Sequence, residues 1–298
     1  MSERGEAAGE AAGEVHAVGL VPHRERPQAH SLARWSVDWL VAHGIDVRVP
    51  SPDAPAAGLD AYAVDPDKFA TGLDLVVSFG GDGTMLYTVQ LVYPAPVPII
   101  GVNVGHLAYL SEIEPDEVET VLPRLVAGRF RVSERMVLEV DVESATDAAG
   151  TRYALNEAVL EKQRTGHMIR LEVSINGSHF TSYAADGLIV ATPTGTTAYS
   201  FSARGPIASP ALRCTVLTPI SPHMLFDRSL VLGEHEELEF LVCDGRSAEL
   251  TIDGRELGPL AGGDRMRCRA AAEPLRLATI HPRDFHQILK MKFALPDR

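Results

Sequence analysis

Cysteine is scarce in this chain, which has three in 298 residues, Cys214, Cys243 and Cys268. Their odd number argues against a disulfide framework, and their wide spacing matches no set of metal ligands. We therefore expect free thiols, buried or half-buried, in a protein of a reducing compartment.

Long apolar runs are also lacking. No stretch approaches the ~20 consecutive apolar residues of a membrane-spanning helix, and no apolar signal segment stands at the N-terminus. We therefore expect a cytoplasmic protein that does not bind membranes.

Positive charge is in deficit. Lysine and arginine together number 27 against 40 aspartate and glutamate residues, which gives a net charge of −13 at pH 7. Clustered cations supply the affinity for nucleic-acid backbones and anionic lipids, so this balance argues against both partners. A small phosphorylated ligand is still compatible with it, because local dipoles can hold such a ligand.

The first half of the chain predicts an α/β domain. Residues 1–14 are small, polar and acidic, and we expect a disordered tail there. From residue 15 to residue 130, short β-branched strands alternate with helices. This alternation predicts a doubly wound, Rossmann-like parallel sheet.

The second half predicts a different architecture. Residues 131–280 read as a mostly antiparallel β domain, which begins with one long strand over 131–142. Asn176-Gly177 is a strong hairpin signal within it. Residues 281–298 predict a C-terminal helix that packs back on the first domain.

The central motif is the glycine-rich string FGGDGT at residues 79–84, between an apolar strand and a helix. Such a turn is typical of a phosphate site, because glycines let backbone N–H groups approach an anion and the helix start adds a positive dipole. No lysine follows, so the turn is not a P-loop. The Asp82 carboxylate would repel phosphate unless a metal bridges the two or the carboxylate acts as a base. An ordinary turn with a helix-capping aspartate is the alternative.

Two further strings carry polar groups that a packed core does not need. Asn156 and Glu157 stand side by side at a strand edge, where an amide and a carboxylate suit ribose hydroxyls or the edge of a base. Two solvent-facing strand residues are the alternative. The string DGLIVATPTGTTAYSFSARGP at residues 186–206 leads from a strand through a turn rich in threonine into a short helix, and a capped helix is its alternative.

Together with GVNVGHLAYL at residues 101–110, these strings resemble the bacterial NAD kinases (the ATP/polyphosphate NAD kinase family) in order and spacing. FGGDGT alone is shared with diacylglycerol kinases, sphingosine kinases and 6-phosphofructokinases. The Asn-Glu pair and the TPTGTTAYSFS string narrow the resemblance from this wider superfamily to the NAD kinases. It implies phosphorylation of the adenosine-ribose 2′-hydroxyl of NAD to NADP by ATP or inorganic polyphosphate, with Mg²⁺ carried by the donor. It also implies a homodimer or homotetramer.

The resemblance implies a role for each matching position. Asp82 would be the general base. Tyr199 would stack on a base, and Asp186 would reach a ligand in a neighbouring subunit. For His167 a solvated β edge is the alternative, and for Asp253 a hairpin turn. The residues implied to bind the cofactor are Gly83, His106, Tyr109, Asn156, Glu157, His167, Asp186, Thr194, Thr197, Ala198, Tyr199, Ser202 and Asp253.

Some positions depart from the family pattern. Ala184 replaces a common Lys or Arg, Arg204 a Gly and Arg255 a Gln, and Tyr109 stands at a common Phe. The first three change the charge near a phosphorylated ligand, so they leave the donor open. They also motivate one alternative, a non-catalytic NAD(P)-binding paralogue. A lipid or sugar kinase of the same superfamily is the other, and the Asn-Glu pair argues against it.

Overall fold

The computed structural model describes residues 13–105, 108–164, 167–243, 245, 247–281 and 284–295. The chain divides into two compact units, and each is described by itself. The first comprises Met1–Glu134 and Leu275–Arg298, and the second comprises Arg135–Pro274. Most of the expected disordered tail lies outside the described residues. Among the described helices, none has the length and hydropathy needed to cross a membrane.

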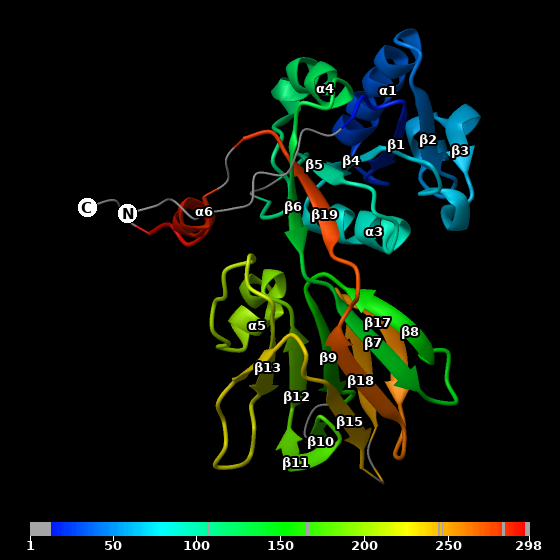
Figure 1. Cartoon of the computed structure of the whole chain (residues 1–298). Helices are drawn as coiled ribbons and strands as arrows, with labels where there is room; N and C mark the ends of the chain where they lie inside the picture. The colour runs from blue at the N-terminus through cyan, green and yellow to red at the C-terminus, as the bar shows by residue number, and fades with distance from the viewer. Residues whose placement is uncertain are drawn as a thin grey trace. The chain divides into compact units, whose positions relative to one another are not determined.

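The first unit is built on a seven-stranded sheet with the order β3-β2-β1-β4-β5-β19-β6 (Figure 1). Strands β1 to β5 and β19 pair in parallel, which confirms the predicted doubly wound sheet. The strands are β1 (Ala17–Pro22), β2 (Asp46–Pro50), β3 (Ala63–Val64), β4 (Leu75–Gly80), β5 (Ile99–Asn103), β6 (Arg131–Arg135) and β19 (Leu275–Thr279).

Helices cover this sheet because its central strands are apolar along their whole length. Every residue of β1 and β4 is buried, as expected for parallel strands covered on both faces. Helix α1 starts at a proline in its first turn and buries Ala29, Ala33, Val37 and Leu40 at helical spacing. The helices are α1 (Pro27–Ala42), α2 (Ala54–Ala57), α3 (Asp82–Val92), α4 (Val118–Val126) and α6 (Phe285–Lys292), with 3₁₀ turns at Asp60–Tyr62, Pro66–Lys68 and Pro115–Glu117.

The glycine-rich turn lies at the carboxyl edge of the sheet. The chain runs outward from β1 through β2 to β3 on one side, and from β4 to β5 on the other. The strand order therefore reverses between β1 and β4. Open α/β sheets bind ligands outside the carboxyl ends of the strands at such a point. Gly80 ends β4 and Asp82 begins α3, so the FGGDGT turn occupies this position.

Two expectations need correction at the boundary between the units. The long strand expected over 131–142 is two strands, because β6 joins the first sheet and β7 belongs to the second unit. Residues 275–280 were placed with the β-rich domain, yet β19 lies in the first sheet, where Leu277 pairs with Ile99 of β5. Pairing between such distant segments leaves no local sequence signal.

The second unit contains two six-stranded antiparallel sheets, with the orders β11-β10-β15-β18-β7-β8 and β14-β13-β12-β9-β16-β17. One core cluster draws residues from both sheets. Asn176 and Gly177 have φ values of 52° and 74°, which confirms the predicted hairpin between β10 and β11. The strands are β7 (Leu138–Glu143), β8 (Gly150–Ala154), β9 (Glu157–Lys162), β10 (Ile169–Ile175), β11 (Ser178–Ala185), β12 (Gly187–Ala191), β13 (Cys214–Ile220), β14 (Leu230–Gly233), β15 (Leu238–Val242), β16 (Ala248–Ile252), β17 (Arg255–Leu260) and β18 (Arg265–Ala270), with a 3₁₀ turn at Thr194–Thr197 and helix α5 (Tyr199–Ser202).

Candidate functional site

In the first unit, Asp82 links the glycine-rich turn to the loop that follows β5. Its half-buried carboxylate accepts the backbone N–H of Tyr109 at 2.9 Å from Oδ1 and 3.0 Å from Oδ2, and the N–H of Leu110 at 2.8 Å from Oδ1. Two N–H groups therefore converge on Oδ1, while Oδ2 accepts one longer bond. A carboxylate oxygen has two lone pairs, so Oδ2 retains capacity for a further donor.

The glycines of this turn fall into two groups. A Cβ on Gly80 would lie 2.1 Å from Oγ1 of Thr84, so packing within the chain requires glycine there. A Cβ on Gly81 or Gly83 would meet nothing within 4 Å. Their missing side chains leave the backbone open at the start of α3, as an approaching anion requires.

The loop after β5 is held from several sides. The guanidinium of Arg26 donates a hydrogen bond to the carbonyl of Val104. The ammonium of Lys292 lies 4.6 Å from the centre of the Tyr109 ring. Among the cofactor contacts expected in this loop, His106 lies outside the described residues. The structure shows Tyr109 bonded through its backbone to Asp82, and a contact with cofactor stays a prediction.

In the second unit, Asp253 organises the Asn-Glu pair. It forms the hairpin turn between β16 and β17 with a left-handed φ of 48°. Its carboxylate accepts the backbone N–H groups of Leu155 at 2.8 Å, Asn156 at 2.8 Å and Glu157 at 3.0 Å. Desolvation, which these N–H groups only partly offset, raises the pKa of Asp253 to about 6. Asp253 thus holds the turn that presents Asn156 and Glu157.

Glu157 is the most perturbed carboxyl group of the site. It is 6% exposed, and its Oε2 atom has no hydrogen-bond partner among the described residues. Burial and then the charge of Asp253 raise the pKa of Glu157 to about 8, against the opposing N–H of Tyr199. At neutral pH the group is therefore protonated and able to donate a hydrogen bond to a ligand.

This pKa shift predicts how stability depends on pH. Between the ordinary pKa of 4.5 and the folded value of about 8, the unfolded chain ionises Glu157 and the folded chain does not. Stability that is present below pH 4.5 is therefore lost as the pH rises, by about 1.4 kcal/mol per unit at most. The neutral isostere in Glu157→Gln lacks this loss. In urea unfolding, the free energy of unfolding of Glu157→Gln relative to the wild type should therefore increase by about 2 to 4 kcal/mol from pH 5 to pH 8. A difference that stays constant with pH would contradict the raised pKa of Glu157.

The threonine-rich turn packs directly against the Asn-Glu turn. The Thr192 hydroxyl donates to the carbonyl of Leu155 at 2.5 Å, and the Thr196 hydroxyl donates to the carbonyl of Pro193 at 2.7 Å. A Cβ on Gly195 would lie 2.1 Å from the carbonyl oxygen of Asn156, so the two backbones touch there. These buried hydroxyls stabilise the turn. Some of the threonines in the 186–206 string therefore have a structural role.

The residues expected to bind cofactor in this turn differ in exposure. Thr194 and Thr197 are buried, and the Thr197 hydroxyl donates to the Thr194 carbonyl at 3.3 Å. Ala198 is half-buried, and Tyr199 and Ser202 are exposed. The exposed pair offers the turn's most accessible contacts.

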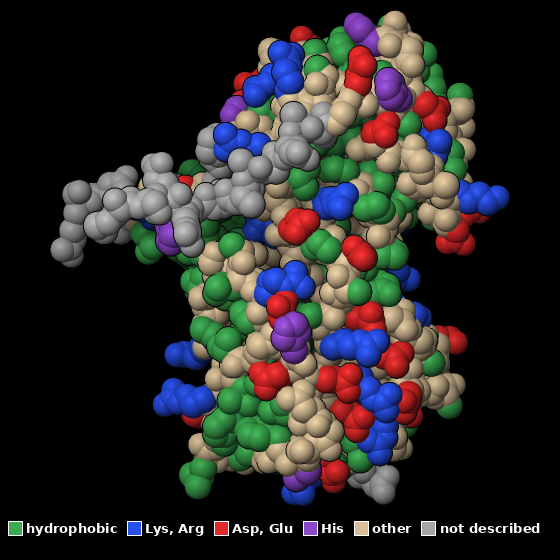
Figure 2. Space-filling view, viewed as in Figure 1, with side chains coloured by type: hydrophobic (Ala, Val, Ile, Leu, Met, Phe, Trp, Pro, Cys, Tyr) green, Lys and Arg blue, Asp and Glu red, His purple; other side chains and the backbone are tan. Residues whose placement is uncertain are grey.

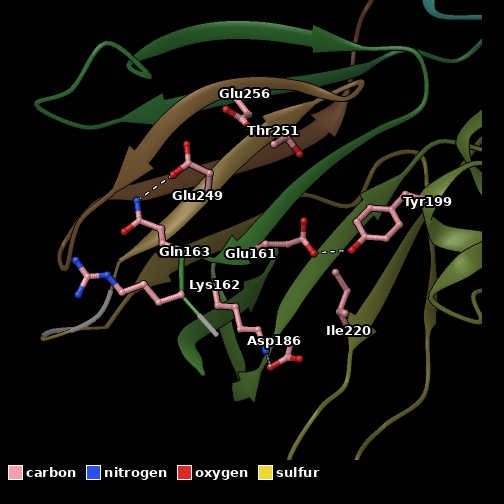
Figure 3. A pocket seen from close by; sticks show the side chains of 10 residues that line it. Glu161, Lys162, Gln163, Asp186, Tyr199, Ile220, Glu249, Thr251 and Glu256 are labelled. Carbon is pink, nitrogen blue, oxygen red and sulfur yellow. Dashed lines mark hydrogen bonds and ion pairs between the residues drawn. The ribbon is translucent and has the colours of Figure 1, made fainter. Parts of the chain in front are cut away.

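A pocket of about 780 Å³ opens beside this turn (Figure 3). It brings together two of the expected residues, Asp186 and Tyr199, and adds partners that the sequence did not reveal. Lys162 pairs with Asp186 at 2.7 Å, and the Tyr199 hydroxyl donates to Glu161 at 2.5 Å. The pocket is lined by Glu161, Lys162, Gln163, Arg164, Asp186, Tyr199, Ile220, Glu249, Thr251 and Glu256.

Strand periodicity gives the signal that identifies Glu161. Residues 157 and 161 lie on one face of β9, because side chains alternate along a strand. His167 is exposed in the segment between β9 and β10, outside the lining of this pocket. Within the described residues, no group of three or more His, Cys, Asp or Glu side chains is arranged to hold a metal ion.

Comparison with known proteins gives matches over both units. A model of the ATP-NAD kinase N-terminal domain matches residues 18–130, and one of the ATP-NAD kinase C-terminal domain matches residues 155–280. An NAD kinase of Heliobacterium modesticaldum is 38% identical over 276 residues, 92% of this chain and 97% of the relative. An NAD kinase of Moorella thermoacetica is also 38% identical over 276 residues, 92% of this chain and 88% of the relative.

Two solved structures share the fold. Yeast NADH kinase complexed with NADH superposes with a TM-score of 0.87 at 23% identity, over 96% of this chain and 90% of that one. An NAD kinase from Archaeoglobus fulgidus in complex with ATP gives a TM-score of 0.68 at 24% identity, over 88% of this chain and 92% of that one.

Proposed function

The chain belongs to the NAD kinase family, and from this premise we propose how its residues carry out the reaction. The enzyme transfers a phosphoryl group from ATP or inorganic polyphosphate to the 2′-hydroxyl of the adenosine ribose of NAD. One observation carries the assignment of residues. The carboxylate of Asp82 stands at the switch point of a parallel sheet, between two glycines whose backbone is open.

Asp82 acts as the general base. A ribose hydroxyl is too weak an acid to ionise at pH 7, but in a loose phosphoryl transfer its proton leaves late, so a positioned carboxylate suffices. The N–H groups of Tyr109 and Leu110 fix the carboxylate, and Oδ2 faces the hydroxyl. The open backbone at Gly81 and Gly83 binds phosphate oxygens. Positioning and electrostatic stabilisation supply most of the rate.

Mg²⁺ fits this arrangement as a companion of the donor. It favours substrate phosphates and keeps several waters, so the donor's phosphates and water would hold it while Oδ2 of Asp82 stays available to the hydroxyl. When bound, it neutralises charge on the phosphoryl donor.

The second unit binds NAD. Glu157, protonated and buried, donates to a ribose or base oxygen, and Asn156 beside it offers both an acceptor and donors. Tyr199 stacks on a base. The remaining contacts that we propose are Gly83, His106, Tyr109, His167, Asp186, Thr194, Thr197, Ala198 and Ser202, with Asp253 positioning the Asn-Glu turn.

The link between Glu161 and Tyr199 gives a testable consequence for NAD binding. Glu157 and Glu161 stand about 13 Å apart on β9 and engage the backbone N–H and the hydroxyl of Tyr199 respectively. Glu161→Ala should therefore loosen the ring and raise KM for NAD about tenfold with little change in kcat, since one charged hydrogen bond is lost. Glu161→Gln keeps an acceptor and should recover most of the affinity. Steady-state kinetics distinguish these cases, and an unchanged KM in Glu161→Ala would remove Glu161 from the site.

We also propose a cytoplasmic homo-oligomer. The second unit exposes large apolar side chains, and Figure 2 shows such groups gathered over part of its surface. Exposed patches of this kind commonly mark contacts between proteins. Light scattering on the full chain tests the assembly, which we expect to be a dimer or tetramer. The exposed large apolar groups in the second unit are Phe180, Tyr199, Phe201, Ile207, Leu212, Leu225 and Val231.

A substrate screen separates the alternative activities. With labelled ATP and Mg²⁺, the enzyme should label NAD and leave diacylglycerol and fructose 6-phosphate unlabelled. Label in either of the last two would favour a lipid or sugar kinase. Tight binding of NAD without labelling by any donor would favour a non-catalytic paralogue.

A further inference from the structure

Phosphoryl transfer commonly uses a protein cation beside the donor's Mg²⁺, and the FGGDGT turn is not followed by the lysine of a P-loop. We propose that Lys292, from the C-terminal helix α6, supplies that cation. The inference deepens the proposed function and rests on it, because it names a further residue for the same donor site.

The path of the chain explains how a residue so late in the sequence reaches this place. Strand β19 is parallel to β5, so both strands end at the carboxyl edge of the sheet, where the FGGDGT turn also lies. Immediately after β19, the backbone N–H groups of Ile280 and His281 donate to Oε1 of Glu112 at 2.9 and 2.6 Å. The C-terminal segment is thereby fastened to the loop that follows β5.

Helix α6 then places Lys292 against Tyr109, whose backbone N–H binds Asp82. Asp284 caps the helix, since its side chain accepts the N–H of His286 at 2.8 Å. In the last turn, the Lys292 ammonium lies 4.6 Å from the centre of the Tyr109 ring. The backbone N–H of Tyr109 is the group that donates to both oxygens of Asp82. Tyr109 therefore connects Lys292 to the general base, because its ring contacts Lys292 and its backbone N–H binds Asp82.

Two arginines at this edge, Arg24 and Arg26, have structural contacts. Arg24 forms an ion pair at 2.5 Å with Asp53 and so offsets the charge of this carboxylate, whose side chain is fully buried. Arg26 donates to the carbonyl of Val104 and so holds the loop. Lys292 is exposed, and one of its contacts is with the face of the Tyr109 ring. A lysine ammonium is a compact point charge with three donors, which suits phosphate oxygens.

A structural explanation for Lys292 also exists. Cations in the last turn of a helix are favoured by the helix dipole, and Lys290 and Lys292 share that position. Residues two apart on a helix do not share a face, so they do not present their side chains to the same neighbour. Lys290→Ala is therefore a control for charge, because it removes an equal charge from the same turn at a position that does not share a face with Lys292.

The test uses the full chain and compares Lys292→Ala, Lys292→Arg and Lys290→Ala with the wild type. We expect Lys292→Ala to lower kcat/KM for ATP about ten- to hundredfold, as loss of a charged hydrogen bond to phosphate would. KM for NAD and Tm should stay near the wild-type values. Lys292→Arg should recover part of the loss, and Lys290→Ala should match the wild type. Calorimetry with inorganic tripolyphosphate should show weaker binding for Lys292→Ala alone.

The outcomes separate this inference from the proposed function. If Lys292→Ala behaves as Lys290→Ala while Asp82→Asn is inactive, Lys292 does not bind the donor and the proposed function stands. A loss that is accompanied by a lower Tm and unchanged tripolyphosphate affinity would also overturn the inference in favour of a structural contact. If the wild type forms no NADP, the proposed function fails, and the calorimetric comparison still decides whether Lys292 binds phosphate.

Discussion

Asp82→Asn should fold normally, bind NAD and lose about 10² to 10⁴ in kcat, the usual contribution of a general base. The two carboxylate oxygens of Asp82 have different roles. Oδ1 accepts both the Tyr109 and the Leu110 N–H groups, and the amide oxygen of asparagine can keep both bonds. The asparagine NH₂ replaces Oδ2 and cannot accept the proton of the ribose hydroxyl. Turnover with saturating NAD and ATP, together with NAD binding by calorimetry, measures the two effects separately.

A second variant tests whether Asp82 is only a structural link between two loops. Asp82→Ala removes both the base and the acceptor for the two N–H groups. If the link alone mattered, Asp82→Asn would turn over at nearly the wild-type rate and Asp82→Ala would be inactive. We expect both variants to be inactive, with only Asp82→Ala showing a lower Tm.

Asp253→Ala should cost about 4 to 6 kcal/mol of unfolding free energy and abolish measurable NAD affinity. Three backbone N–H groups, those of Leu155, Asn156 and Glu157, would lose their acceptor, at about 1 to 3 kcal/mol for each buried group. Alanine is also strained at the left-handed φ of 48°. Urea unfolding measures the loss.

Two milder variants at this position separate hydrogen bonding from backbone strain. Asp253→Gly relieves the strain and should recover about 1 kcal/mol relative to Asp253→Ala. Asp253→Asn tolerates the left-handed backbone, and its Oδ1 can still accept from Asn156 and Glu157, so it should cost about 1 to 3 kcal/mol. An Asp253→Ala protein as stable as Asp253→Asn would show that the carboxylate does not hold the Asn-Glu turn.

Much of the first unit could be predicted because its signals are local. The apolar strand before FGGDGT, the glycines of the turn and the helix after it all lie within about twenty residues, and the structure places them as expected. The parallel sheet followed from the alternation of strands and helices. The open backbone at Gly81 and Gly83 agrees with the chemistry that the turn predicted.

What the sequence could not predict depends on contacts between distant segments. Asp253 resembled a binding residue, yet its carboxylate caps a turn almost a hundred residues earlier. The contacts of Glu161 with Tyr199 and of Lys162 with Asp186 join segments that are distant in the sequence, so the sequence does not reveal them. Strand β19 returns to the first sheet from near the end of the chain, and a short strand carries no signal for its partner.

We propose that this enzyme makes NADP by phosphorylating the 2′-hydroxyl of NAD with Asp82 as base. The most direct measurement follows NADP with an NADP-specific dehydrogenase, for wild type and Asp82→Asn, with ATP and then polyphosphate as donor in the presence of Mg²⁺. We predict NADP from the wild type with at least one donor, and a rate lower by about 10² or more from Asp82→Asn. No NADP from a wild type that binds NAD would contradict the kinase activity, and comparable rates from the two proteins would contradict the role of Asp82 as base.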